Sequence, residues 1–72
     1  MMQLEEIIEV LSFASGNELA VRLELEDGSE VVGVPSSVDL HPTAHEVFLM
    51  PSGNDQTEIG ISIHAITLAE LR

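Results

Sequence analysis

Histidine and aspartate side chains are the groups in this 72-residue chain whose type and spacing could do chemistry. His41 and His45 lie four positions apart, a spacing at which two imidazoles on one helix face can bind a metal ion. Pro42 and the loop-like composition around it argue against a regular helix here, and the neighbouring sequence offers no evident third ligand. We therefore interpret both residues as loop histidines and expect no metal or other cofactor.

Asp39 and His64 are further candidates for contact with a ligand. Asp39 follows a predicted strand, where its carboxylate either accepts hydrogen bonds from loop amides or orients a ligand; the turn role is favoured because aspartate commonly makes such turns. His64 lies on the outward face of a predicted strand, as a ligand contact or as a solvated residue. No serine has a His–Asp pattern nearby, and the scattered glycines form no phosphate-binding loop. We predict a non-catalytic protein.

The charge of the chain limits its partners. Thirteen acidic residues face two arginines and no lysine, which gives a formal net charge of −11. Nucleic-acid binding depends largely on cations that neutralise phosphates, so RNA is possible but disfavoured. Stacking on surface aromatics could still hold a single strand, but Phe13 and Phe48 both lie in apolar segments that indicate core positions. The charge suits a basic protein partner or simply solubility.

The N-terminal third predicts a helix and then a hairpin. Over about residues 3–13, one face is rich in glutamate, and the opposite face carries an apolar stripe at helical spacing, made of Leu4, Ile7, Ile8 and Leu11. The run Ser15-Gly16-Asn17 indicates the helix end. Residues 19–26 alternate between apolar and polar, as in a half-buried strand, and Asp27-Gly28 predicts a tight turn. The return strand contains Gly33, a sign of a bend, and Pro35 should weaken or end its pairing.

The C-terminal half predicts three further strands. Residues 36–45 are expected to form a loop, and the continuous apolar run 47–50 a strand buried on both faces. Residues 51–55 are turn formers, residues 59–63 alternate again, and residues 66–71 close the chain. We expect one domain over residues 1–72: a mainly β fold with an N-terminal helix followed, over about residues 18–71, by a strongly bent five-stranded small barrel.

This order of elements resembles that of Sm-like (LSm) proteins, small SH3-like barrels that commonly form rings and bind RNA. Matching positions are Asp27-Gly28, Gly33 and Asp39-x-His41, while residues 63–67 resemble the second signature of bacterial Sm-like RNA chaperones. The resemblance implies Asp39, His41 and His64 as ligand or RNA contacts, with His64 lining a pore. The chain departs from the pattern where Pro42-Thr43 replaces Met-Asn and where Ile63 replaces a lysine, and both changes weaken the case for RNA.

A second resemblance fits the acidic charge. The segment LELEDGSEVVG and the later Ile66-Thr67 resemble the acidic Rho-binding antiterminator (Rof) family, which shares the small barrel and the N-terminal helix. That resemblance implies binding to a basic RNA-handling ATPase by electrostatic mimicry of nucleic acid.

Self-association is also expected, because a small barrel leaves strand edges open and the run at 47–50 is too apolar for free exposure to water. Pairing of this run with the 59–63 strand of a neighbour would close a ring if the rotation permits; alternatively, the helix covers it within one chain. The candidate edge residues are Val47, Phe48, Leu49, Met50, Ile59, Ile61 and Ile63.

The sequence therefore predicts a homo-oligomeric scaffold in RNA- or transcription-related biology with weak or lost RNA binding. The alternative is an acidic factor that binds a basic nucleic-acid-handling protein. No signal peptide or long apolar run is evident, so we expect a cytoplasmic protein without membrane contact.

Overall fold

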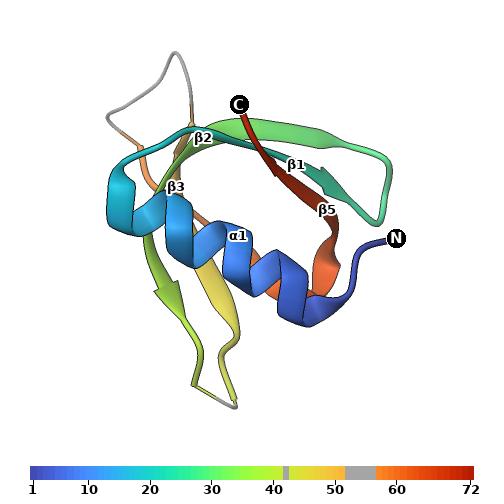
Figure 1. The fold of residues 1–72 in the computed structure, drawn as a ribbon. Helices are drawn as coiled ribbons and strands as arrows, with labels where there is room; N and C mark the ends of the chain where they lie inside the picture. The colour runs from blue at the N-terminus through green and yellow to red at the C-terminus, as the bar shows by residue number, and fades with distance from the viewer. Residues whose placement is uncertain (42, 52–56) are drawn as a thin grey trace.

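The computed structural model describes residues 1–41, 43–51 and 57–72 (Figure 1). As predicted, the protein is mainly β, with an N-terminal helix before a five-stranded antiparallel sheet that bends strongly. In chain order the elements are α1 (Leu4–Asn17), β1 (Val21–Leu25), β2 (Glu30–Asp39), β3 (Glu46–Pro51), β4 (Ile59–Ser62), the short 3-10 helix η1 (Ile63–Ala65) and β5 (Ile66–Leu71). None of the helices in these ranges is long and apolar enough to cross a membrane.

The helix α1 is longer than its sequence pattern suggested. The expected end near residue 13 is wrong: residues 15–17 are helical, the helix ends at Asn17, and Glu18 caps it in the left-handed conformation with φ 54°. The Asn17 side chain contributes to the last turn, because its Nδ2 donates to the Phe13 carbonyl at 2.8 Å.

The first hairpin forms as the Asp-Gly dipeptide predicted. Gly28 takes a φ of 89°, a conformation that glycine adopts without steric cost. Asp27 accepts two hydrogen bonds from Ser29, one from the backbone N–H at 2.9 Å and one from the hydroxyl at 2.6 Å. In β1 the alternating pattern buries Val21 and Leu23.

The bend in the sheet occurs along β2, which changes partner at Gly33. Up to this residue β2 pairs with β1, in the register Val21↔Gly33, and from it onward β2 pairs with β3. A side chain at Gly33 would overlap the Met50 carbonyl oxygen, so the close approach of the paired strands β2 and β3 requires glycine here. The strand then continues through a register shift between Pro35 and Ser37.

Pro35 weakens the pairing, as expected, but does not end it. The expected loop over residues 36–45 is wrong in its first part, because residues 36–39 belong to β2. The register shift lets the strand continue although Pro35 has no N–H to donate. Across the two strands, the Ser36 hydroxyl donates to the Phe48 carbonyl at 3.1 Å.

The sheet order β4-β3-β2-β1-β5 places β3 in the interior of the sheet. The apolar run 47–50 is thus not an edge: β2 and β4 of the same chain pair with its two sides, which corrects the expected contact with a neighbour. Only one of its faces is fully buried, through Val47 and Leu49. These residues join one core cluster with the buried face of α1: Ile7, Leu11, Ala14, Val21, Leu23, Val47, Leu49, Ile63, Ile66 and Ala69.

Candidate binding site and strand edges

Asp39 and His41 lie where β2 ends and the chain turns back towards β3. The Asp39 carboxylate accepts the backbone N–H of His41 at 2.9 Å, which is the turn role considered for it from the sequence. The His41 ring folds over the same turn, with Nδ1 2.8 Å from Thr43 Oγ1 and 3.3 Å from the Thr43 backbone nitrogen. The Thr43 backbone N–H donates to Nδ1, and the Thr43 hydroxyl lies within hydrogen-bond distance of the same atom.

His64 pairs with His45, not with His41. His64 Nε2 lies 3.2 Å from His45 Nδ1, and the two rings meet edge to face with centroids 5.0 Å apart and an interplanar angle of 75°. His45 has a φ of 41°, and its carbonyl accepts the Ile63 N–H at 2.8 Å. One backbone bond and one side-chain contact thus join the β2–β3 connection to η1.

The His45–His64 contact depends on the protonation of the rings. The contact needs one ring nitrogen that carries a proton and donates, and one that carries none and accepts. If both rings were protonated, two donors and two positive charges would face each other and the contact would break. Among residues 1–41, 43–51 and 57–72, no group of three or more histidine, cysteine, aspartate or glutamate side chains is placed to hold a metal ion.

The Thr43–His41 contact has the distance of a nucleophile and its base, but the surrounding contacts among the described residues supply no third group that would orient the base. A catalytic base is normally oriented by a third group bonded to its second ring nitrogen. Asp39 instead bonds the His41 backbone, and within the described residues His41 Nε2 has no hydrogen-bond partner. We read the contact as part of a turn.

The outer strands of the sheet are β4 and β5. In the described part of the chain, β4 pairs with β3 alone, with Ile59 and Ile61 half-buried along it. Ile63, the third predicted edge isoleucine, is wrong as an edge residue because it is fully buried and begins η1.

The second outer strand, β5, is partly covered by the N-terminal segment. The Met2 N–H donates to the Thr67 carbonyl at 2.9 Å, and the Ala69 N–H meets the Met2 sulfur at 3.2 Å. A thioether is a weak acceptor, so the second of these contacts satisfies the strand edge poorly.

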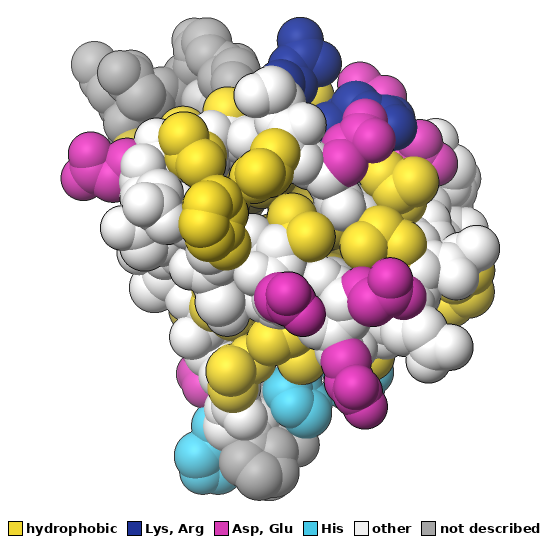
Figure 2. Space-filling view, viewed as in Figure 1, with side chains coloured by type: hydrophobic (Ala, Val, Ile, Leu, Met, Phe, Trp, Pro, Cys, Tyr) yellow, Lys and Arg dark blue, Asp and Glu magenta, His cyan; other side chains and the backbone are white. Residues whose placement is uncertain are grey.

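Arg22 on β1 is held by carboxylates from three strands. Its Nε lies 2.6 Å from Glu70, and its Nη1 lies 2.7 Å from Glu24 and 2.9 Å from Glu30. These hydrogen bonds, the one to Glu70 foremost, raise the pKa of the Arg22 guanidinium above its ordinary value. On the face shown in Figure 2, basic side chains appear only at one end and lie beside acidic ones. One of the two arginines is therefore already occupied within the protein.

Phe13 is a residue whose placement the sequence reasoning missed. The prediction that it belongs to the core is wrong, since its side chain is 53% exposed. It lies two positions after the last leucine of the α1 stripe, and its type alone gave no sign of this exposure. His45 was likewise weighed only as a partner of His41, because its contact with His64 spans 19 positions. Comparison of the chain with protein-family models and with curated proteins finds no match.

Proposed function

We propose that this protein is a non-catalytic Sm-like binding module that assembles with copies of itself into a scaffold. Its setting is RNA- or transcription-related biology in the cytoplasm, and its own RNA binding is weak or lost. The observation that carries the proposal is a single bent sheet whose two outer strands each pair with one other strand in the described chain, with β5 covered only in part by Met2.

These outer strands support assembly because an unpaired strand edge offers a row of backbone donors and acceptors to another strand. A neighbour's β4 added to β5 would be a head-to-tail contact, which closes into a ring if the rotation permits. It would replace the weak Met2 sulfur acceptor at Ala69 with a carbonyl. The half-buried Ile59 and Ile61 would supply apolar area to the same contact.

The charge distribution supports weak RNA binding. Phosphate contacts need free cations, and Arg22 is shared by three glutamates. A phosphate would have to displace these carboxylates from the guanidinium while approaching a chain with a formal charge of −11. The histidines at the β2–β3 end are the remaining contact candidates, and His45 and His64 already bond each other.

Native mass spectrometry over a range of protein concentrations tests the assembly. We expect a discrete oligomer that Ile61→Lys breaks, because a lysine on an edge strand opposes pairing with another chain. Val32→Lys is the matched control, since Val32 is also half-buried but lies on the interior strand β2. Thermal melts establish that both variants fold. A wild-type protein that stays monomeric at high concentration contradicts the proposal.

RNA binding is tested separately, with short U-rich and A-rich oligonucleotides at low and at physiological salt. We expect no more than weak affinity, present at low salt alone and reduced by His41→Ala or His64→Ala. Tight binding at physiological salt would contradict the weak-binding part of the proposal and leave the assembly untouched.

A second candidate is favoured by the occupied state of Arg22: the protein is an acidic factor that binds a basic nucleic-acid-handling protein. With one arginine shared among three glutamates, most carboxylates have no basic counterpart in the chain. Such a partner should be retained on immobilised protein at low salt and released steeply as salt rises, because exposed charges are screened. Retention that is independent of salt contradicts this candidate.

A further inference from the structure

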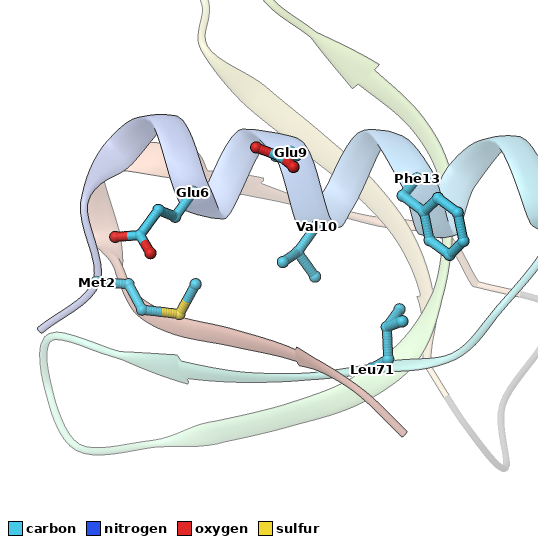
Figure 3. A pocket seen from close by; sticks show the side chains of 6 residues that line it. All are labelled: Met2, Glu6, Glu9, Val10, Phe13 and Leu71. Atoms are coloured by element: carbon cyan, nitrogen blue, oxygen red, sulfur yellow. The ribbon is translucent and has the colours of Figure 1, made fainter.

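A groove runs between α1 and the C-terminal end of β5. Its volume is about 340 Å³, near the small end of ligand sites, which span roughly 300–1,000 Å³. Figure 3 shows the Met2, Val10 and Leu71 side chains directed into the space between helix and strand, with Phe13 further along the helix than Val10. Six residues line the groove: Met2, Glu6, Glu9, Val10, Phe13 and Leu71.

Part of the apolar lining of this groove lies outside the core: Met2 and Val10 pack against the core cluster, whereas Phe13 and Leu71 do not belong to it. The buried face of α1 is made by Ile7, Leu11 and Ala14, whereas Val10 and Phe13 lie on a second stripe of the helix at i, i+3 spacing. Phe13 is 53% exposed and Leu71 is 48% exposed. Two large apolar side chains thus face water beside each other, and burial of such area is a main source of association energy.

The rim of the groove is acidic. Glu6 and Glu9 are exposed residues of the same helix, and the lining contains no basic residue. An apolar floor with carboxylates along one side complements a segment that carries apolar side chains on one face and lysine or arginine on the other. The net charge of −11 attracts such a segment from a distance as well.

The same charges disfavour two other occupants. Symmetric contact between two copies places the same patch against itself, so the acidic rims of both copies would enter one interface. An anionic lipid surface would likewise be repelled by the acidic rim.

We propose that the α1–β5 groove binds a basic amphipathic helix of a partner protein, with Phe13 as its principal apolar contact and Glu9 as a charge contact. The inference rests on the acidic-factor candidate above and adds where and how the partner docks. Recognition is of the helix-in-groove kind, in which apolar side chains at i, i+3, i+4 and i+7 fill the groove while basic residues flank it.

Three labelled peptides of equal length test the proposal by fluorescence anisotropy with the full chain. The probe carries leucines at i, i+3, i+4 and i+7 and lysines elsewhere; one control replaces the leucines by alanine, the other replaces the lysines by glutamate. We expect binding of the leucine–lysine peptide alone, since the groove needs both apolar contact and opposite charge. Rising salt should weaken the binding without abolishing it, because the apolar contact is not screened.

Matched variants locate the site. Phe13→Ala should lower the affinity about tenfold, as truncation of a central aromatic contact typically does. Leu40→Ala should leave it unchanged, because Leu40 is 48% exposed but precedes the His41 turn and does not line the groove. Glu9→Gln should weaken binding by up to about fivefold. Glu26→Gln removes the same charge from the β1–β2 turn and should have little effect.

Several outcomes would overturn the proposal. The peptide results would overturn it if the probe did not bind, or if the alanine–lysine peptide bound equally well. The variants would overturn it if Phe13→Ala and Leu40→Ala had equal effects. NMR would overturn it if the amide shifts caused by the peptide centred away from α1 and β5. Native mass spectrometry of Phe13→Ala adds another: loss of an oligomer would assign the groove to a second copy. A failed peptide test with the oligomer intact refutes the groove and leaves the scaffold function standing.

Discussion

Replacement of Gly33 by alanine tests the close approach of β2 to β3 at the bend of the sheet. A Cβ at this position would overlap the carbonyl oxygen of Met50 and lie 2.9 Å from both Met50 C and Leu49 Cδ2, where ordinary contacts of a Cβ begin near 3.4 Å. The obstructing oxygen belongs to the backbone of β3, so it cannot rotate away as a side chain would. The two strands must separate at the point where β2 changes partner.

The expected cost follows from this geometry. Overpacking costs about 1–3 kcal/mol and occasionally more, and a backbone obstruction places Gly33→Ala near 3 kcal/mol. A 72-residue domain has a free energy of unfolding of about 4–11 kcal/mol, so the loss is a large share of it. At about 4–8 °C per kcal/mol for a domain of this size, Tm should fall by about 12–24 °C.

Urea and thermal unfolding followed by far-ultraviolet circular dichroism measure this loss, since the chain has no tryptophan for fluorescence. Gly16→Ala is the matched control: Gly16 is within α1, and a Cβ there meets nothing within 4 Å. That substitution should raise the free energy of unfolding by about 0.4–1 kcal/mol. If the free energy of unfolding of Gly33→Ala lay within about 0.5 kcal/mol of the wild-type value, the range of an ordinary surface change, the close approach of β2 to β3 would be refuted.

Three further outcomes are expected. Leu11→Ala should cost about 2–5 kcal/mol because Leu11 is fully buried, whereas Leu40→Ala should change stability by less than about 0.5 kcal/mol; similar losses would contradict the core assignment. The two hydrogen bonds from Ser29, that of the hydroxyl foremost, lower the pKa of Asp27, so their stabilisation is present above its ordinary pKa and is lost as pH falls through the folded value. Ser29→Ala should therefore raise the Asp27 pKa seen by NMR titration and reduce this acid loss of stability, and an unchanged titration would count against the turn geometry. Arg22→Met should lower the free energy of unfolding more at low than at high salt, because three carboxylates are left without their cation; a loss independent of salt would show that packing alone is involved.

Much of the fold could be predicted from local sequence patterns. The helical stripe of α1, the alternation in β1 and the Asp27-Gly28 turn each depend on neighbouring residues, and all three are present in the structure. Gly33 signalled the bend, because only glycine permits so close an approach of two paired strands. The errors arose where one local signal was given too much weight. Pro35 was expected to weaken or end pairing; a register shift weakens the pairing there, and the strand continues beyond it.

The candidate site was harder to predict because its contacts join residues distant in sequence. Asp39 was expected to accept hydrogen bonds from loop amides, and its carboxylate accepts the backbone N–H of His41. His64 finds its partner 19 positions earlier, in His45, through the packing of η1 against the β2–β3 connection. No periodicity reports such a contact.

By itself, the sequence determined the class of the elements, the tight turn, the bend at Gly33 and the acidic charge, because each depends on residue type or on near neighbours. Only the tertiary structure decided which strands are edges, since an edge is defined by which partner is missing from the sheet. It also placed Glu70 beside Arg22, 48 positions away, and left Phe13 exposed beside Leu71. The groove that we propose as a docking site exists only because α1 covers the bent sheet without covering the end of β5.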